Sequence, residues 1–513
     1  MSRTVLVQAR WIVTGSGRDD AVLENAALRI EDGKIVELGG WRELCARHPD
    51  AALLGGPSCA VIPGLINAHH HALGATHQQQ GLMDDFLEPW IFGFAKFRAG
   101  DTRIDKLLSA ARMLRSGITT VVDVHSGGGT ARDYEATIEA ALGAYRESGM
   151  RVAFAPGFST RCHLVHGDTG ADAAFLATLP ADLATRARQL FLPEKGDADE
   201  DDYFGIVEDA IARHRGDRTI DVWFGPPGPQ WVGDDCLMRA AERAAALDTR
   251  IQTHLVESYY EKLLGPRLWS SATLHHLDTL GVLSPRFTVA HGTWLTDSEI
   301  ALLAERGAAV SHNPSSNLRL RAGIAPLNVM LAAGATVGIG LDGTTINDDD
   351  DMFAEMRLAL RLQRGPAFGD PAPSPRDVFG LATGGGARLI GKEKSLGRLA
   401  KGYEADLVVL DLDRMLAPWT APDVDPLELI VLRAQPRDVR SVLVAGELVC
   451  DQGRTLGFDE AALARELAER LSRQPFPADA ARTVAELSPY LARWYGAWPQ
   501  PERRPHIAYN SRT

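Results

Sequence analysis

The chain has 513 residues, of which 45% are hydrophobic and 24% are charged, values that are ordinary for a soluble globular protein. This length exceeds the size at which a single core keeps growing, so it predicts one very large domain or two domains. The formal net charge of −13 argues against nucleic acid and against anionic membranes as the main partner.

Targeting and redox signals indicate a cytoplasmic protein. No window approaches the roughly 18 uninterrupted apolar residues of a membrane span, and the N-terminus lacks the apolar region and cleavage site of a signal peptide. The five cysteines are odd in number and widely spaced, at Cys45, Cys59, Cys162, Cys236 and Cys450. They predict buried thiols in a reducing compartment rather than a disulfide framework or a cysteine-type zinc site.

The two ends of the chain carry β-type patterns. Short apolar runs occupy residues 5–7, 11–13, 27–30 and 34–38, with a hairpin turn at Asp32-Gly33. We expect a small antiparallel sheet that is too short to form a core alone. Because β character returns over 393–450, we predict that residues 1–60 and 393–460 form one composite β-sandwich domain.

From residue 61 to 392 the pattern changes to alternating strands and helices. Predicted strands cover 61–67, 119–125, 151–156, 219–225, 250–255, 286–291, 308–312 and 335–341. Predicted helices include 102–116, 131–148, 234–247, 258–280, 296–306 and 326–333. The alternation favours an α/β fold, a (β/α)₈ TIM-type barrel, although the pattern alone leaves a doubly wound sheet open.

The C-terminal segment, residues 461–513, has a different character. Residues 460–475 have the pattern of an amphipathic helix. The remainder, 476–513, is rich in proline and aromatic residues and has no obvious core pattern. We expect this segment to pack on the protein or at a subunit interface.

A histidine triplet ends the first predicted barrel strand, in Pro63-Gly64-Leu65-Ile66-Asn67-Ala68-His69-His70-His71. Because side chains alternate along a strand, His69 and His71 point the same way and His70 points away. Two imidazoles on one face are half of a metal site, but such a pair alone is equally typical of a surface cluster.

Polar residues also end the later predicted strands, at His125, His254, His291, His312 and Asp342. In a barrel these strand ends meet at one rim, where chemistry is done. His69, His71, His254 and Asp342 therefore make a nitrogen and oxygen site for one divalent metal ion, with zinc expected and ferrous iron as the alternative. The strand ending at 223–227 offers no lysine or glutamate to bridge a second ion. Glu257, three residues after His254, is placed for proton transfer.

Several motifs in order resemble the amidohydrolase superfamily, in its cytosine-deaminase-like branch of aminohydrolases and chlorohydrolases. They are the histidine triplet with its Pro-Gly, Met113 to Asp123, His254-Leu-Val-Glu257, Val289-Ala-His-Gly292, Ser311 to Leu318, Gly340-Leu-Asp-Gly343 and Gly402 to Leu407. The resemblance runs from about residue 4 to 460 and implies a (β/α)₈ barrel with a composite β-sandwich.

The resemblance also implies roles for individual residues. His69, His71, His254 and Asp342 match metal ligands, Glu257 a proton shuttle, and His291 a residue that orients hydroxide or substrate. The implied reaction is hydrolytic deamination of a small nitrogen heterocycle (purine, pyrimidine, pterin or triazine) by metal-bound hydroxide. Glu257 protonates the ring nitrogen, and Asp342 takes the hydroxide proton. We expect substrate contacts from Gln78, Trp90, His125, Gln230 and His312, and a homodimer or homotetramer.

Two alternatives remain from the sequence. The same fold could hydrolyse a carbon–chlorine bond or a cyclic amide or urea. A barrel that binds a ligand without catalysis would have lost a metal ligand or the shuttle, and this sequence has lost none. The loop 226–231 lacks the histidine that nucleoside-deaminating relatives often carry, which weakens an adenosine-type assignment.

Overall fold

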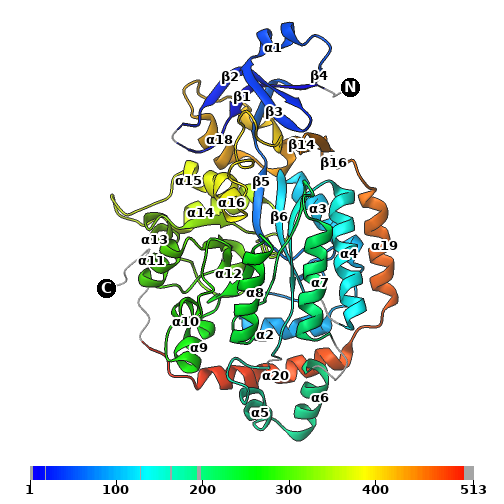
Figure 1. Cartoon of the computed structure of the whole chain (residues 1–513), viewed down its shortest axis with the longest axis vertical. Coiled ribbons are helices and arrows are strands. Elements are labelled where there is room, and N and C mark those ends of the chain that lie inside the picture. The colour runs from blue at the N-terminus through cyan, green and yellow to red at the C-terminus, as the bar shows by residue number, and fades with distance from the viewer. Residues whose placement is uncertain (1–3, 18, 127–128, 162–163, 193–197, 502–513) are drawn as a thin grey trace.

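The computed structural model describes residues 4–17, 19–126, 129–161, 164–192 and 198–501. A sheet built from both ends of the chain lies at one end of the molecule (Figure 1). Below it lies a larger α/β body with parallel strands at its centre and helices around them (Figure 1).

The terminal sheet has eight strands in the order β16-β15-β14-β13-β4-β1-β2-β3. Its strands are β1 (Val5–Val13), β2 (Val22–Glu31), β3 (Lys34–Gly40), β4 (Ala52–Pro63), β13 (Leu407–Asp411), β14 (Val439–Val444), β15 (Glu447–Asp451) and β16 (Arg454–Thr455). The runs predicted near the N-terminus pair antiparallel as expected, β1 with β2 and β2 with β3, whereas β4, which was not predicted in this sheet, pairs with β1 in parallel. Helix α1 (Trp41–Arg47) provides the crossover that a parallel pair requires.

The central strands form two parallel sheets of four strands each, β5-β6-β7-β8 and β12-β11-β10-β9. Their bounds are β5 (Leu65–His70), β6 (Ile118–Ser126), β7 (Arg151–Gly157), β8 (Ile220–Val222), β9 (Ile251–Leu255), β10 (Phe287–His291), β11 (Ala309–His312) and β12 (Thr336–Ile339). Backbone hydrogen bonds join their edges: Phe224 N–H donates to Arg250 at 3.0 Å, and Leu341 N–H donates to His69 at 3.1 Å.

The segment predicted as one strand over 61–67 is divided between the two parts of the molecule. β4 ends at Pro63 in the terminal sheet, and β5 begins at Leu65 in the central one. At Gly64 a side-chain carbon would lie 2.2 Å from Thr119 Oγ1, closer than atoms can approach. Glycine therefore allows the chain to pass from one sheet to the other at this point.

Helices follow most central strands. They are α3 (Thr102–Arg115), α4 (Ala131–Ser148), α7 (Glu200–Arg213), α8 (Asp234–Ala246), α9 (Tyr259–Trp269), α10 (Thr273–Thr279), α11 (Asp297–Arg306), α12 (Pro314–Arg319), α13 (Leu327–Ala332) and α14 (Met352–Leu362). The single helix predicted over 258–280 is two helices. Ser270 has a φ of 55°, and this left-handed residue ends α9 before α10 begins.

Additional helices complete the chain. They are α2 (Leu87–Phe92), η1 (Gly93–Lys96), α5 (Ala171–Leu176), α6 (Ala181–Phe191), α15 (Pro375–Gly380), η2 (Leu381–Gly385), α16 (Gly386–Leu389), α17 (Leu412–Leu416), α18 (Pro426–Arg433), η3 (Pro436–Asp438), α19 (Glu460–Arg473) and α20 (Ala478–Gly496). Helix α19 lies along the outer side of α3 (Figure 1).

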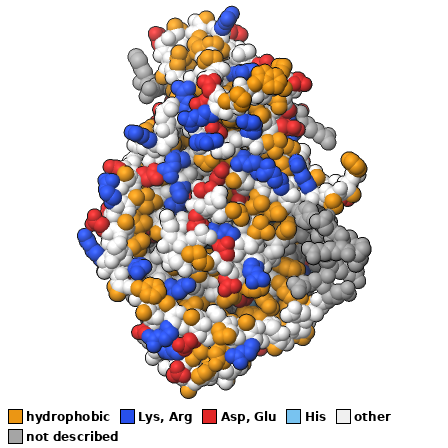
Figure 2. Space-filling view, turned by 180° about the vertical axis from the view of Figure 1, so that it is seen from behind, with side chains coloured by type: hydrophobic (Ala, Val, Ile, Leu, Met, Phe, Trp, Pro, Cys, Tyr) orange, Lys and Arg blue, Asp and Glu red, His pale blue; other side chains and the backbone are white. Residues whose placement is uncertain are grey.

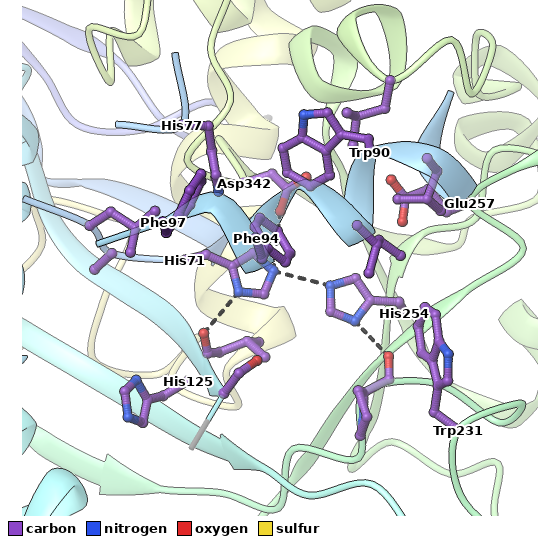
Figure 3. A pocket seen from close by; sticks show the side chains of 18 of the residues that line it. His71, His77, Trp90, Phe94, Phe97, His125, Trp231, His254, Glu257 and Asp342 are labelled. Carbon is purple, nitrogen blue, oxygen red and sulfur yellow. Dashed lines mark hydrogen bonds and ion pairs between the residues drawn. The ribbon is translucent and has the colours of Figure 1, made fainter. Parts of the chain in front are cut away.

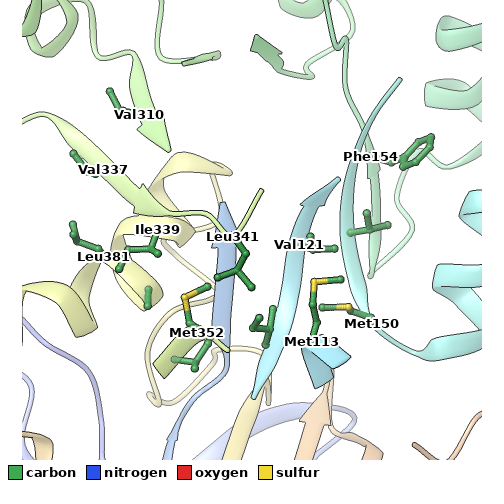
Figure 4. Packing of buried hydrophobic residues seen from close by; sticks show 14 of the residues in the cluster. Met113, Val121, Met150, Phe154, Val310, Val337, Ile339, Leu341, Met352 and Leu381 are labelled. Carbon is green, nitrogen blue, oxygen red and sulfur yellow. The ribbon is translucent and has the colours of Figure 1, made fainter. Parts of the chain in front are cut away.

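The main apolar core packs around the central strands. Met113, Val121 and Met150 lie together on one side of β5, whereas Ile339 and Met352 lie on the other side (Figure 4). This packing fixes the strand ends that carry the polar residues, because close-packed interiors tolerate little displacement.

Residues 478–496 form helix α20, which the sequence pattern did not reveal. Helix α20 packs against α2, α6 and η1, and runs along the end of the molecule opposite the terminal sheet (Figure 1). Val484, Leu487 and Leu491 are buried at helical spacing, but Pro489 stands among them and disguises the pattern. Residues 502–513, including the tail aromatic Tyr509, lie outside the described residues.

Basic and acidic side chains are interspersed over the face seen in Figure 2, so the net negative charge is not gathered in one area of it. Cys59, Cys236 and Cys450 are buried, as predicted, but Cys45 is partly exposed on a short surface helix; Cys162 lies outside the described residues. Among the described helices, none combines the length and apolar character needed to cross a membrane.

Candidate metal and active site

Four side chains from three strand ends converge at one point of the central body. Ligand atoms of His69, His71, His254 and Asp342 all lie within 4.8 Å of one another. His69 and His71 come from the end of β5, His254 from β9, and Asp342 from the segment after β12. Figure 3 shows His71, His254 and Asp342 directed toward this point.

Hydrogen bonds at Nδ1 fix the orientation of the His71 and His254 imidazoles. Nδ1 of His71 lies 2.9 Å from the Val124 carbonyl oxygen, and Nδ1 of His254 lies 2.7 Å from that of Pro227 (Figure 3). A carbonyl oxygen only accepts, so both Nδ1 atoms donate. Burial lowers the pKa of each imidazole to about 3, so both are neutral and each Nε2 carries a lone pair.

These two Nε2 atoms lie 3.2 Å apart, and two lone pairs cannot hydrogen-bond to each other. His69 completes the arrangement. Its Nδ1 lies 2.8 Å from Gln252 Oε1, and its buried Nε2 has no hydrogen-bond partner. Asp342 Oδ1 stands 3.0 Å from that Nε2. This donor set, three imidazole nitrogens and one carboxylate oxygen, fits a divalent cation such as zinc.

Asp342 is held in an ionised, strained position. Burial opposes its ionisation, yet the surrounding histidines, His69 foremost, keep its pKa well below the ordinary value. Its Oδ2 accepts a hydrogen bond from the Ser316 hydroxyl. The backbone of Asp342 has a φ of 57°, and that of His291 has a φ of 72°. Such left-handed conformations in residues other than glycine are found preferentially at functional sites.

A second group adjoins the first and shares Asp342 with it. Glu257 Oε2 lies 3.5 Å from His291 Nε2, and His291 Nδ1 donates to Asn317 Oδ1 at 2.9 Å. The Glu257 side chain is 3% exposed, and its Oε1 has no hydrogen-bond partner. Burial and the nearby negative charges of Asp342 and other carboxylates raise the pKa of Glu257 well above its ordinary value. Glu257 is therefore suited to hold a proton near neutral pH.

A cavity of about 540 Å³ opens over these two groups. His71, His254, Glu257, His291 and Asp342 form its floor. His77, Trp90, Phe94 and Phe97 pack against one another as an aromatic wall on one side of the cavity, and Trp231 lies on another side, next to His254 (Figure 3). The segment from 72 to 97 thus supplies much of the cavity lining.

The structure separates the five residues expected to contact substrate. Trp90 and His125 line the cavity, whereas Gln78, Gln230 and His312 are not among its lining residues. Gln78 donates to Asp84 at 3.3 Å, and Gln230 donates to Glu261 at 2.8 Å. His312 is 1% exposed, in the layer below the cavity. These three side chains are engaged or buried elsewhere, because a strand end or loop sequence does not specify where its side chains point.

Other residues of the site were missed from the sequence. Gln252 orients His69, and its position two residues before His254 on the same face of β9 was a usable signal. Asn317 and Ser316 stand in a motif that was recognised only as a resemblance. Phe94 and Trp231 carry no signal in the sequence, since any buried aromatic residue has the same pattern.

His70 points away from the metal-ligand group, as the strand alternation predicted. Its Nε2 lies 3.0 Å from the Ser109 hydroxyl, and its Nδ1 accepts from the backbone N–H of Gly343 at 3.0 Å. This imidazole thus ties the loop that follows Asp342 to β5.

The acidic run 348–351 has a structural role. Asp351 begins α14 and accepts hydrogen bonds from two N–H groups of its first turn. Asp350 Oδ2 lies 3.0 Å from Arg112 Nε, and Asp348 forms an ion pair with Arg319.

Comparison with known proteins confirms the family resemblance. Residues 60–449 match the model of the amidohydrolase family, and residues 26–51 match a bacterial imidazolonepropionase-like composite domain. The chain is 33% identical to 8-oxoguanine deaminase of Pseudomonas aeruginosa, covering 90% of this chain and 97% of the relative. It is 30% identical to 5'-deoxyadenosine deaminase of Methanosarcina barkeri, covering 89% of this chain and 95% of the relative.

Solved structures agree. An adenosine deaminase from Xanthomonas campestris with bound zinc has a TM-score of 0.77 and 27% identity, covering 92% of this chain and 99% of that one. A triazine hydrolase from Arthrobacter aurescens has a TM-score of 0.77 at 24% identity, covering 91% of this chain and 99% of that one, and shows likeness of fold. The family match spans most of the sequence and includes every residue of the two groups described above. This chain is therefore a member of the amidohydrolase family.

Proposed function

We propose that the protein is a metal-dependent hydrolytic deaminase that releases ammonia from an aminated nitrogen heterocycle of the purine type. One observation carries the proposal: a convergent set of three imidazoles and a carboxylate lies beside Glu257, a buried acid whose pKa is raised well above its ordinary value. A metal-binding group next to a proton donor is the pair that hydrolysis of an aromatic amine requires.

In this proposal His69, His71, His254 and Asp342 hold one divalent ion. When bound, the ion supplies Lewis acidity that makes hydroxide available from water near neutral pH. The three Nδ1 hydrogen bonds keep the imidazoles pointing at the ion site without further rearrangement. Zinc is the proposed ion, supported by the donor set and by the zinc in the similar adenosine deaminase structure.

The remaining residues move or direct protons. Glu257 gives its proton to the ring nitrogen next to the carbon that carries the amino group. Of the two protons of the attacking water, Asp342 accepts one and passes it to the departing ammonia, and the other returns Glu257 to its protonated form. His291 donates from Nδ1 to Asn317, so its Nε2 carries a lone pair. Nε2 therefore accepts a hydrogen bond from the nucleophile or the substrate.

The purine preference rests on the named activities of the relatives, which are deaminases of 8-oxoguanine, 5'-deoxyadenosine and 5-methylthioadenosine or S-adenosylhomocysteine. Trp90 and Phe94 offer apolar faces on which a flat heterocycle can stack. Hydrolysis of a carbon–chlorine bond is the second candidate, favoured by the fold likeness to a triazine hydrolase.

The domain architecture, the oligomeric state and the cellular compartment are part of the same proposal. We infer that the two parallel sheets close into a (β/α)₈ barrel, supported by the backbone hydrogen bonds across both pairs of edges. The chain divides into the terminal β-sandwich domain (1–60 and 393–460), the barrel domain (61–392) and a C-terminal segment (461–513) that packs on the protein or at a subunit interface. We further propose a homodimer or homotetramer in a reducing cytoplasm. The reducing compartment is supported by the free thiols of the four cysteines that the structure describes.

A substrate panel tests the function. Zinc-loaded protein is assayed for ammonia release from aminated purines, pyrimidines, pterins and triazines, with chloride and carboxylate products measured in parallel. We expect ammonia from one or more purines, and a loss of at least about 100-fold in kcat for E257Q, which cannot give a proton. Chloride release without ammonia would favour the second candidate.

Metal dependence is measured on the same samples. We expect one zinc ion per chain by elemental analysis, and loss of activity in the presence of a chelator that added zinc reverses. Metal content well below one ion per chain, unchanged by added zinc, would favour a barrel that binds ligand without catalysis.

A further inference from the structure

Glu257 stands on a strained turn that must be held in place by its surroundings. β9 ends at Leu255, and the next residue, Val256, has a φ of 42°. A β-branched residue rarely adopts this left-handed conformation, because its side chain then crowds the backbone. Since Glu257 follows directly, its carboxylate keeps its place over His291 only while neighbouring contacts maintain the turn.

Glu261, in the first turn of α9, supplies such a contact. Its Oε2 accepts a hydrogen bond from the backbone N–H of Glu257 at 2.7 Å. Its Oε1 accepts from the Gln230 side-chain amide at 2.8 Å. Glu261 is 3% exposed and Gln230 is 5% exposed, so both bonds lie away from solvent. Hydrogen bonds that a carboxylate makes in a buried setting are among the strong ones.

Ordinary helix capping does not account for this geometry. In a capping box, the acidic side chain at the third helical position bonds to the backbone N–H of the N-cap residue. Here the N-cap is Ser258, whose hydroxyl accepts from Glu261 N–H at 3.2 Å. The Glu261 carboxylate passes over Ser258 and bonds one residue further back, to Glu257 itself.

The same junction is tied to two walls of the cavity. Gln230 precedes Trp231, which lines the cavity, and its bond to Glu261 links that loop to α9. The Ser258 hydroxyl donates to buried Glu88 of α2, the helix that also carries Trp90. His166 Nε2 lies 3.6 Å from Glu88, and the backbone N–H of His166 donates to Tyr495 of α20 at 2.9 Å.

From these contacts we infer that Glu261 is a positioning residue for the proposed reaction: with Gln230 it fixes the Glu257 carboxylate relative to the aromatic wall that holds the substrate. The inference rests on the proposed function, because it assigns Glu257 the proton transfer. A displacement of a reacting group by about 1 Å costs on the order of 100-fold in rate. Loss of Glu261 therefore reduces kcat while leaving most substrate contacts, and hence KM, in place.

Four variants test the inference: E261A, E261Q, Q230E and the double variant E261Q/Q230E. E261A removes both bonds and is expected to lower kcat about 10- to 100-fold with KM changed less than about threefold. Each of the other single changes disrupts the contact between positions 261 and 230. In E261Q the new amide cannot accept from both the Glu257 N–H and the Gln230 amide, and in Q230E two carboxylates face each other without a donor.

The double variant reverses the donor and acceptor of the pair. The amide introduced at position 261 accepts from the Glu257 N–H and donates to the carboxylate introduced at position 230. We expect kcat of the double variant to return to within about threefold of the wild type. The matched control is D377N, which alters the exposed capping-box acid of α15 far from the cavity and is expected to leave kcat unchanged.

Hydrogen exchange of the peptide containing residue 257 gives a second readout that does not depend on turnover. We expect faster exchange of the Glu257 amide in E261A and near wild-type exchange in the double variant. Wild-type kcat in E261A, unchanged exchange, or a double variant no better than the single ones would overturn the inference. If the wild type deaminates nothing while E261A exchanges faster, the contact stands and the proposed function fails.

Discussion

Lys106 Nζ lies 2.7 Å from Asp123 Oδ2, and this buried pair holds both backbone polar groups of Ala72, the residue that follows His71. Asp123 Oδ1 accepts from Ala72 N–H at 3.1 Å, and Lys106 donates to the Ala72 carbonyl at 3.3 Å. Tyr145 donates a further hydrogen bond to Asp123 at 2.8 Å. The exit of β5, and with it the His71 ring, is therefore fixed by charges from β6 and α3.

Breaking this pair is expected to destabilise the protein. In D123N the Lys106 ammonium stays buried without its counter-charge, and such losses cost about 3–5 kcal/mol. Urea unfolding measures the free energy, and zinc titration is expected to show weaker binding because His71 loses its support. The control D278N breaks the partly exposed pair with Arg306, where we expect a change below about 1 kcal/mol. A D123N effect as small as that of the control would contradict the prediction.

His312 makes the stability of the protein depend on pH. Burial lowers the pKa of this imidazole from 6.5 to about 4, so the unfolded chain binds a proton at a higher pH than the folded protein does. Stability contributed by the neutral side chain is complete above about pH 6.5 and is lost progressively as the pH falls toward 4. At pH 5 the loss is about 2 kcal/mol.

H312L, which places an apolar side chain of similar size there, is expected to lose less stability on acidification than the wild type, and the other buried histidines maintain the rest of the dependence. Thermal melts of metal-free protein between pH 7.5 and 5 compare H312L with the wild type and with H275Q, a change at an exposed histidine. The wild type and H275Q should lose stability in parallel. Equal slopes in all three proteins would show that His312 titrates in the folded protein as it does in the unfolded chain.

Substrates with phosphate groups are expected to be poor. No arginine lines the cavity among the described residues, and the lining cation Lys106 is committed to Asp123. Burying a phosphate without a counter-charge is strongly unfavourable. We expect kcat/KM for a nucleoside 5'-monophosphate to be at least about 100-fold below that of the matching nucleoside or base. Comparable values for the two would require a cation from residues beyond those that line the cavity.

Helix α20 is expected to stabilise the folded protein. Leu487 is fully buried and belongs to the apolar cluster that includes Phe175, Leu264 and Trp498. Truncation in L487A is expected to cost about 2–5 kcal/mol, measured by urea unfolding. L456A alters a leucine that is 54% exposed and should cost much less. An unchanged free energy of unfolding in L487A would indicate that the packing of α20 does not stabilise the fold.

Much of the fold followed from local patterns. The predicted central strands lie within about two residues of the observed ones in most cases, because apolar runs bounded by turn residues specify strands locally. The errors have physical causes: Gly64 ends one sheet and begins another inside one apolar run, Ser270 breaks a helix through its own backbone conformation, and Pro489 disguises the buried face of α20.

The order of residues along the chain specifies which side chains end the central strands, and therefore which donor atoms are available there: His69, His71, His254 and Asp342 can be read from the strand ends. How those atoms are oriented depends on tertiary packing. Their orientation depends on partners distant in sequence, such as Gln252 behind His69 and Val124 behind His71. The cavity lining is likewise a tertiary feature, since Phe94 and Trp231 come to line the same cavity only after their helix and loop have packed. Alternation along a strand is a local property of the backbone, whereas hydrogen-bond geometry and cavity shape arise from packing between distant segments.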